Sequence, residues 1–411
     1  MIQNTKYMRC TGTKVFGVRA PIIKNDNKLV DIVVDSIKNA VDNGEFTIDN
    51  KDVIGITESI VARSYNQYVT TDDIANSVKE IFGEDQNITI INPILSRNRF
   101  SIILKGIAKA ADKITLFLTA PKDEVGNTLY SKWPLDSYSC VSAEEAGRWL
   151  GESIHPFTGI NYIDLYRDIV TSVGASCDIW ICNENYFNNK PHYTPALSTN
   201  VIYAGIHDNF DKVQILSDKL WYSGNTPIVC SLASICASGW CKGENDEYLP
   251  FNQCHGLYGS NKAGEDKLKL FPDFTICKFV CDKVQEKLKD LYEKDVEVMV
   301  YGDGCFKDPV GGIWEFADPV TAPYYTKGLE GTPNELKLKY LADTVSSDEE
   351  TLKSKIKHKK SYLKGDMSSQ GTTPRRYIDL LASLFDLVSG SGDKGTPIVI
   401  AKGYFDNFAD D

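Results

Sequence analysis

The spacing of apolar residues in the first 120 positions alternates between a helical and a strand period. Apolar residues recur at helical spacing in three segments, which predicts helices over residues 30–41, 71–82 and 99–111. A threonine cap and acids in the first turn mark the start of the second helix. Short apolar runs predict buried strands over residues 52–57, 88–91 and 113–118. The opening third is therefore expected to be a compact unit of alternating helices and strands.

The last third of the chain repeats these two periods, and the middle does so less clearly. Strands are predicted over 296–301 and 396–401, an amphipathic helix over 375–388, and a charged helix with a solvated lysine-rich end over 346–364. The middle of the chain has polar turns and holds four of the five histidines. We therefore expect three parts, namely residues 1–138 and 292–411 as two parts of a core and residues 139–291 as a central insertion or second domain.

Composition narrows the class of protein. The chain has 411 residues, 42% hydrophobic and 25% charged, which excludes a disordered chain, a collagen and a small disulfide-stapled domain. The formal net charge of −11 disfavours nucleic acid and anionic membrane surfaces as partners. The first ten residues lack the apolar core of a signal peptide, and the most apolar stretch, 228–240, is too short to span a bilayer. A cytoplasmic protein with no nucleic-acid or membrane partner is expected.

The eleven cysteines do not form a recognisable metal or redox motif. The closest spacings are Cys177/Cys182, Cys236/Cys241 and Cys277/Cys281, and none of them is a C-x-x-C pair. Most of the cysteines are therefore expected to be buried or reduced thiols. A cysteine-based metal or redox site stays an alternative because four cysteines share one short stretch, namely Cys230, Cys236, Cys241 and Cys254.

The glycine-rich segment 390–395 matches the G-x-G-x-x-G pattern letter by letter. It follows a predicted helix and precedes a predicted strand, whereas a dinucleotide site needs the opposite order. The segment is therefore interpreted either as a backbone anion nest or as an ordinary turn. The sequence also lacks G-x-x-x-x-G-K-[ST], H-E-x-x-H and G-x-S-x-G, which argues against a P-loop, a zinc protease and a serine hydrolase.

Two predicted strands end in loops that contain carboxylates and glycines. Asp303 and Asp308 follow the strand 296–301, and Asp123 and Glu124 follow the strand 113–118. Carboxylate oxygens bind hard cations such as Mg²⁺, and glycines let backbone N–H groups approach phosphates, so a metal and nucleotide site is one interpretation. Tight turns with solvated aspartates are the other. Basic residues that could neutralise phosphate or carboxylate are Arg63, Arg97, Arg99, Lys262, Arg375 and Arg376.

Several segments, in order, resemble those of one enzyme family. Four of them cover much of the two ends of the chain, namely residues 52–64, 122–127, 298–304 and 373–403. Four more extend the similarity through the chain, namely residues 96–100, 259–262, 328–335 and 391–396. Together they resemble the coenzyme F420-0:L-glutamate ligase family (F420 gamma-glutamyl ligases), in particular its longer bacterial branch.

The resemblance implies a fold, a reaction and partners. The fold would be an α+β, two-domain ligase fold with mixed or antiparallel sheets and a large central insertion, and the protein would be a homodimer. The reaction would use GTP or ATP with Mg²⁺ or Mn²⁺ to activate a carboxylate of F420-0 as an acyl phosphate, which the amine of L-glutamate attacks. The product would be a gamma-glutamyl amide.

The resemblance also implies roles for particular residues. Asp123 and Asp303 would be the catalytic, metal-binding aspartates, with Glu124 and Asp308 as further metal ligands. Nucleotide or substrate binding would fall to Arg63, Ser64, Arg97, Asn98, Arg99, Asn127, Lys262, Gly302, Gly304, Arg375 and Gly392. Gly304 departs from the family, which has a threonine hydroxyl at that position. A folate-type acceptor, or a non-catalytic nucleotide- or cofactor-binding module on the same fold, stays open.

Overall fold

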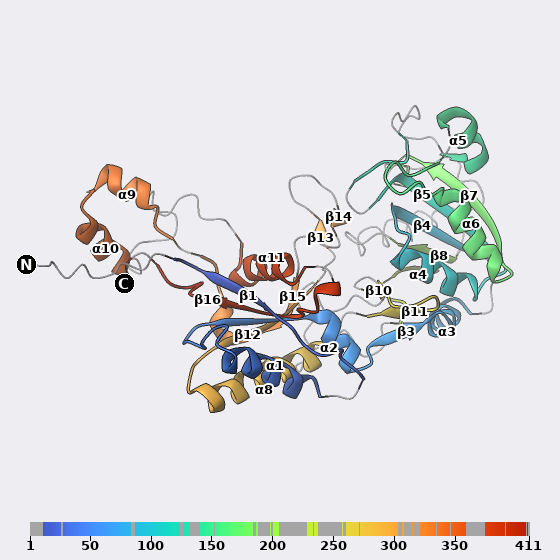
Figure 1. Cartoon of the computed structure of the whole chain (residues 1–411). Helices are drawn as coiled ribbons and strands as arrows, with labels where there is room; N and C mark the ends of the chain where they lie inside the picture. Colours follow the sequence, from blue (N-terminus) through green and yellow to red (C-terminus); the bar gives the residue numbers. More distant parts are fainter. Residues whose placement is uncertain are drawn as a thin grey trace, which may run out of the picture. The chain divides into compact units, whose positions relative to one another are not determined.

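The computed structural model describes residues 11–25, 28–83, 87–123, 126–130, 140–151, 153–183, 186–187, 198, 200–204, 228–232, 234–236, 257, 260–270, 272–302, 306–307, 314–315, 321–333, 335–345, 347–358, 375–390, 392–407 and 409. The chain folds into two compact units. Unit 1 combines Met1–Tyr65, Thr275–Gly302 and Val320–Asp411, and unit 2 combines Asn66–Phe274 and Asp303–Pro319. Figure 1 shows the helices and strands of both units.

Unit 1 is built on a mixed five-stranded sheet in the order β1-β16-β2-β12-β15. The strands are β1 (Lys14–Val18), β16 (Ile398–Lys402), β2 (Val53–Thr57), β12 (Glu297–Gly302) and β15 (Thr321–Tyr325). Strands β2 and β12 are parallel, and the other neighbours are antiparallel. The carboxyl ends of β2 and β12 therefore lie at the same edge of this sheet.

Helices cover both faces of this sheet, as Figure 1 shows. Alternate strand residues such as Ile54 and Val298 pack on α1 (Leu29–Asp42) and α8 (Phe274–Tyr292), and the opposite face packs on α11 (Tyr377–Ser389). The period of two along each strand produces the three layers, because successive side chains point to opposite faces. The remaining helical segments of unit 1 are α2 (Glu58–Ser64), η1 (Lys327–Leu329), α9 (Leu338–Thr344), α10 (Glu349–Lys357) and η3 (Gly392–Lys394).

Unit 2 contains a six-stranded sheet in the order β6-β7-β5-β4-β8-β9. The strands are β6 (Cys140–Ser142), β7 (Ser176–Cys182), β5 (Lys113–Asp123), β4 (Asn87–Leu95), β8 (Asn200–Tyr203) and β9 (Ile228–Ser231). All neighbours are parallel except the edge pair β6 and β7. Parallel strands carry their carboxyl ends to one edge, where α/β sheets commonly bind ligands.

One face of this sheet forms the main core of unit 2 with four helices, and the other forms a smaller aromatic cluster around Phe117 and Phe187. The helices are α3 (Thr71–Phe82), α4 (Arg99–Ala108), α5 (Ala143–Leu150) and α6 (Tyr162–Ser172). Unit 2 also has a three-stranded antiparallel sheet and a two-stranded one, made of β3 (Tyr68–Thr70), β10 (Asn261–Lys262) and β11 (Lys267–Lys269), and of β13 (Phe306–Lys307) and β14 (Trp314–Glu315). Both units thus contain mixed or antiparallel sheets with packed helices, and the predicted α+β class is confirmed.

The predicted elements are present, with some changes at their ends. Helix α3 has the predicted bounds, and its cap is Thr70, whose hydroxyl accepts the Asp73 N–H at 3.1 Å. Helix α4 ends at Ala108 instead of residue 111, and α10 is shorter than the helix predicted over 346–364. Strand β5 continues past the predicted end at 118 to Asp123, and its register with β4 shifts between Asn92 and Ile94.

The boundaries of the two units differ from the expected boundaries at residues 138 and 291. Strands β4 and β5, from the first expected part, share one sheet with β7, β8 and β9 from the middle of the chain. That residues 139–291 are an insertion stays a prediction. Among the described helices, none is long and apolar enough to cross a membrane.

The described cysteines are mostly free thiols, as predicted. Cys177, Cys230, Cys236, Cys277 and Cys281 are free. Cys140 and Cys182 face each other across the β6–β7 pair and form a disulfide, which the sequence analysis did not predict. Spacing along the chain gave no sign of it, because the pairing depends on a strand register between residues 42 positions apart.

Candidate functional site

Asp123 stands at the carboxyl end of β5, beside the loop that follows β4. The parallel register pairs Asp123 with Leu95, the last residue of β4, and Ser96 comes next. The segment 96–99 then leads into α4, so two of the predicted site segments meet at one edge of the parallel sheet. The sequence analysis had selected both segments separately, and the strand pairing brings them together.

A tight turn fixes the Asp123 carboxylate. Oδ1 accepts the backbone N–H of Asn127 at 2.7 Å, and Oδ2 accepts the Asn127 side-chain amide at 2.8 Å. Oδ2 also lies 3.1 Å from Nε2 of His155, and the Asp123 side chain is 12% exposed. Asn127 was predicted as a binding residue, and in the structure it orients the carboxylate.

The described residues fit one carboxylate ligand of a hard divalent cation. Carboxylate oxygens are the ligands that hard divalent cations prefer, and the contacts to Oδ1 and Oδ2 orient this one. Across the part of the chain that the structure describes, no three His, Cys, Asp or Glu side chains are grouped as a metal site would require. Glu124, Asp303, Gly304 and Asp308 lie outside the described residues. Their predicted roles stay predictions.

The loop after β4 presents cations and a helix N-terminus at the same edge. The Arg97 and Asn98 side chains are exposed and Arg99 is buried. Asn98 caps α4 without a side-chain hydrogen bond to the helix. The Tyr166 hydroxyl holds the loop, because it accepts the Ser96 N–H at 2.9 Å and donates to the Ser96 carbonyl at 3.2 Å. Helix N-termini and arginines both attract anions.

The other predicted binding residues lie elsewhere. Lys262 is exposed on β10, in a small sheet that contacts α4. Arg63, Ser64, Gly302, Arg375 and Gly392 belong to unit 1. The structure thus divides the predicted set between two units. Strand pairing brings together the ends of β4 and β5 in unit 2 and the ends of β2 and β12 in unit 1.

Local contacts limit what three of the unit 1 residues can do. Nε of Arg63 donates to the Ile23 carbonyl at 2.7 Å, and Ser64 is fully buried. Arg375 precedes α11, and its guanidinium reaches Ser383 of that helix at 3.4 Å. The Arg63 and Arg375 contacts are within unit 1, and the binding roles of the three residues stay predictions.

The two glycines of unit 1 differ in their surroundings. A side chain on Gly302 would collide with Glu58, which is buried at the start of α2. Nothing lies within 4 Å of where a Cβ would be on Gly392. The segment 390–395 connects α11 to β16, which confirms the predicted order of helix, loop and strand.

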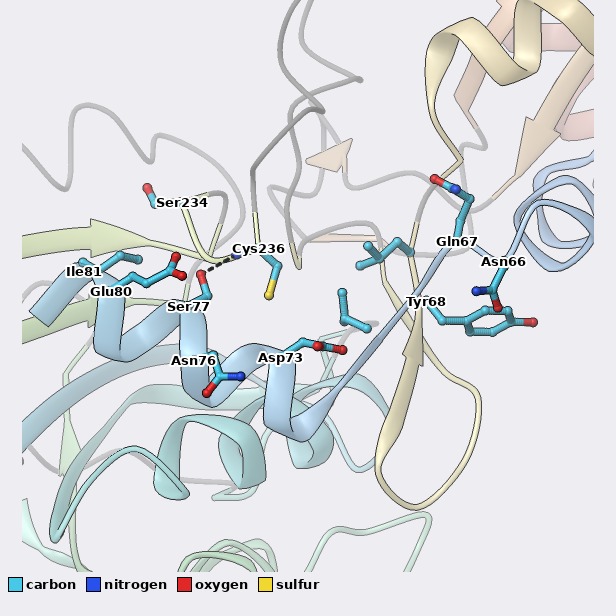
Figure 2. Close-up of a pocket in the computed structure, with 12 residues that line it drawn as sticks. Asn66, Gln67, Tyr68, Asp73, Asn76, Ser77, Glu80, Ile81, Ser234 and Cys236 are labelled. Atoms are coloured by element: carbon cyan, nitrogen blue, oxygen red, sulfur yellow. Dashed lines mark hydrogen bonds between the residues drawn. The ribbon is translucent and has the colours of Figure 1, made fainter. Parts of the chain in front are cut away.

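Unit 2 also contains a cavity of about 500 Å³ beside α3. Its wall includes Asp73, Asn76, Ser77 and Glu80 of α3 and the free thiol Cys236, as Figure 2 shows. The Cys236 backbone N–H donates to Ser77 at 2.9 Å. None of the predicted site residues lines this cavity, and its two carboxylates would disfavour a phosphate.

Two of the four clustered cysteines are described, and both are free thiols. Burial raises the pKa of the Cys230 thiol to about 12 and that of Cys236 to about 11, so both stay protonated, whereas metals bind the thiolate. Cys241 and Cys254 lie outside the described residues. The described pair therefore lends no support to a cysteine-based metal site.

His155 contacts the candidate site residue Asp123 and was not predicted from the sequence. It lies 32 positions from Asp123, in a stretch without a helical or strand period. A histidine alone on such a stretch is more often structural. No local signal in the sequence indicates the role of His155, because its contact with Asp123 forms only in the fold.

Comparison with known protein families matches residues 17–403 to the family described as F420-0:Gamma-glutamyl ligase. The match covers nearly the whole chain, including both strand ends described above. No curated protein matches the chain.

Proposed function

The chain belongs to the F420-0:gamma-glutamyl ligase family, and on that premise we propose that it is a nucleotide- and metal-dependent ligase. It forms a gamma-glutamyl amide bond between L-glutamate and a carboxylate-bearing acceptor. The nucleotide is GTP or ATP, and the metal is Mg²⁺ or Mn²⁺.

The observation that carries this proposal is the contact between the ends of β4 and β5. Asp123, an oriented and mostly buried carboxylate, lies beside a loop with Arg97 and Arg99 at the N-terminus of α4. A carboxylate suits a divalent cation, and the arginines with the helix N-terminus suit phosphate oxygens. Opposite charges at one sheet edge are what a metal-bound nucleotide requires.

The proposed reaction has two steps. The terminal phosphoryl group of the nucleotide passes to a carboxylate oxygen of the acceptor, which gives an acyl phosphate and a nucleoside diphosphate. The amine of L-glutamate then attacks the acyl carbon, loses a proton, and inorganic phosphate leaves. A bound Mg²⁺ or Mn²⁺ would offset the negative charge that develops on the phosphates.

The chain's own residues have distinct parts in this proposal. Asp123 holds the cation, Asn127 orients the carboxylate, and Arg97 and Arg99 bind anionic oxygens. Asp303 supplies the second metal-binding carboxylate, with Glu124 and Asp308 as further ligands. The remaining predicted residues bind nucleotide or substrate, namely Arg63, Ser64, Asn98, Lys262, Gly302, Gly304, Arg375 and Gly392.

The acceptor and the assembly are also proposals. F420-0 is the acceptor that the family implies, and a folate with a terminal glutamate presents the same carboxylate chemistry. The protein acts as a homodimer. A module that binds a nucleotide or another cofactor without catalysis is the second candidate, and the observation that favours it is Gly304, which lacks the threonine hydroxyl of the family.

Asp123→Asn tests the metal assignment. It keeps the size of the side chain and removes the charge, so ligation should fall at least about 100-fold, by analogy with the loss of other charge-stabilising groups. Asp178→Asn is the matched control, because Asp178 is half exposed on β7 and pairs with Lys113 at 2.7 Å. Product is measured by mass spectrometry. Unchanged turnover in Asp123→Asn would contradict the assignment.

A further inference from the structure

The contacts of the Asp123 carboxylate include a residue near in sequence and a distant residue. Asn127 is four positions away and forms the local turn, whereas His155 comes from the loop between α5 and α6. The His155 ring is 3% exposed, so its contact with Asp123 is shielded from water. A shielded hydrogen bond constrains a carboxylate more than an exposed one does.

The tautomer of His155 follows from its other contacts. Nδ1 accepts the backbone N–H of Phe157 at 3.4 Å and that of Thr158 at 3.2 Å. A nitrogen that accepts these bonds carries no proton, so the ring proton is on Nε2 and is donated to Asp123. His155 therefore gives Asp123 a neutral hydrogen-bond donor, which does not compete with a cation for the carboxylate charge.

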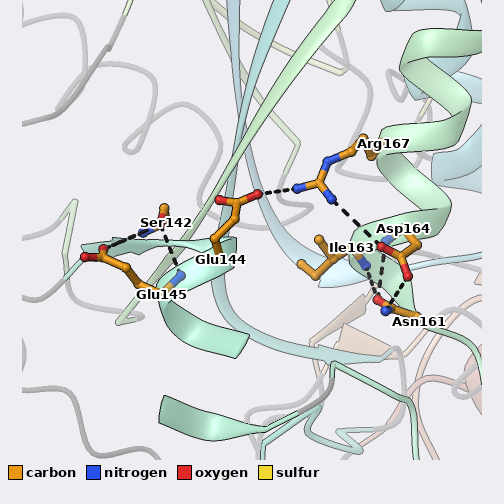
Figure 3. Close-up of polar contacts among 7 residues, drawn as sticks. All are labelled: Ser142, Glu144, Glu145, Asn161, Ile163, Asp164 and Arg167. Carbon is orange, nitrogen blue, oxygen red and sulfur yellow. Dashed lines mark hydrogen bonds and ion pairs between the residues drawn. The ribbon is translucent and has the colours of Figure 1, made fainter. Parts of the chain in front are cut away.

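The loop that carries His155 is itself braced. Ile154 and Asn161 form an isolated bridge, and the His155 N–H donates to the Ile160 carbonyl at 2.8 Å. Figure 3 shows the end of this loop, where Asn161 accepts the N–H groups of Ile163 and Asp164 and so caps α6.

Further contacts connect α6 to α5 and to the loop after β4. Arg167 of α6 pairs with Glu144 of α5 at 2.7 Å, as Figure 3 also shows. Tyr162 packs edge-on against the His155 ring, with centroids 5.8 Å apart, and also contacts Tyr166. The Tyr166 hydroxyl binds Ser96, so one helix supports both His155 and the loop with the arginines.

We propose that His155 is a positioning residue that fixes the Asp123 carboxylate for cation binding through its Nε2–H. The inference rests on the proposed function in that Asp123 is taken as the metal ligand. Removing a hydrogen-bond donor that orients a metal ligand commonly lowers metal affinity by about 10- to 100-fold.

Two substitutions separate the donor from the rest of the ring. His155→Asn places an amide oxygen near Nδ1, where it still accepts the N–H groups of Phe157 and Thr158, but it does not reach Asp123. His155→Gln extends far enough to offer Asp123 an amide N–H. The test titrates Mn²⁺ into the full-length wild type, both variants and Asp123→Asn, and reads free Mn²⁺ by electron paramagnetic resonance.

We expect His155→Asn to weaken Mn²⁺ binding about 10-fold or more, and His155→Gln to stay within about threefold of the wild type. The role of His155 would be overturned if His155→Asn bound Mn²⁺ as tightly as the wild type, or if His155→Gln lost as much affinity as His155→Asn. In either case, weaker Mn²⁺ binding by Asp123→Asn would still support the metal site. Wild-type affinity in Asp123→Asn would overturn the metal assignment and this role with it.

A measurement on the wild type covers the case in which the variants fail to fold. Long-range ¹H–¹⁵N correlation on ¹⁵N-histidine-labelled protein distinguishes the two neutral tautomers. We expect the Nε2–H form for His155, and the Nδ1–H form would overturn the inference.

Discussion

Lys402 is the cation that stabilises the buried carboxylate of Asp52. Its Nζ lies 2.7 Å from Asp52 and 2.7 Å from Asp49, and it also donates to the Thr47 carbonyl. Burial raises the pKa of Asp52, although the hydrogen bond from Lys402 acts in the opposite direction. A charged Asp52 at neutral pH therefore costs free energy because the carboxylate is buried. The ion pair with Lys402 reduces that cost.

Lys402→Met should lower the free energy of unfolding by about 2–4 kcal/mol at pH 7, because it leaves a buried charge without its partner. The loss should shrink toward pH 4. Because the pKa of Asp52 is raised in the folded state, the folded protein binds a proton at Asp52 as the pH falls. A neutral Asp52 needs no cation. Urea denaturation at both pH values measures this. Lys289→Met is the control, since its pair with Asp295 is exposed, and a loss that grew on acidification would contradict the account.

Gly302 and Gly392 were both predicted to bind ligand, and the structure separates them by packing. Gly302→Ala should destabilise the fold by about 1–3 kcal/mol, because the added methyl collides with buried Glu58. Gly392→Ala should change stability by less than about 0.5 kcal/mol, because its surroundings are open. Denaturation midpoints give both values, and equal midpoints would show that the close approach at Gly302 is unimportant.

At the residue scale, the sequence can select candidate residues where the chemistry is local. Asp123 and Asn127 lie in one short turn, so the sequence could select both. The contact with His155 could not be predicted, because it depends on β5, on the loop after α5 and on α6 meeting in the fold.

Gly55 sets the distance between β2 and α11. A methyl group at Gly55 would overlap the ring of Phe385, which is fully buried on α11. The helix packs against this strand face only because the side chain is absent.

Gly55→Ala should therefore cost about 2–3 kcal/mol of stability through overpacking. Gly147→Ala in α5 has no neighbour within 4 Å of the added carbon, and it should stabilise the protein by up to about 1 kcal/mol through helix propensity. Thermal denaturation followed by circular dichroism compares the two. A stabilised Gly55→Ala would show that α11 can move away from β2.

Element-scale prediction from sequence gave the kind of element and its buried face, but not its partners. The period along β4 identifies a strand, whereas its pairing with β8, more than a hundred positions later, has no local signal. The predicted end of β5 at residue 118 was wrong because proline ordinarily ends a strand, whereas β5 continues to Asp123 across a shift in its register with β4.

At the scale of the whole molecule, each unit is assembled from distant segments. In unit 1, β1 from the start of the chain pairs with β16 from its end. In unit 2, strands from residues 87–231 share one sheet. Hydrophobic period cannot predict such assembly, which explains why the expected division into three parts does not coincide with the two units.

The proposed homodimer can be tested on the intact protein. Sedimentation equilibrium should give twice the mass of one chain at concentrations used for activity. The mass should not change over a tenfold dilution. A single-chain mass over the whole range would contradict the dimer, and it would leave the ligase proposal to be decided by activity.

The most direct test of the central claim is a ligation assay on the wild-type protein. The protein is incubated with L-glutamate, GTP or ATP, and Mg²⁺ or Mn²⁺, with F420-0 and mono-glutamyl folate as separate acceptors, and the products are analysed by mass spectrometry. The account predicts a product heavier by one glutamyl unit that forms only with both nucleotide and metal. Absence of that product with every acceptor, while the nucleotide still binds, would contradict the ligase and favour a binding module.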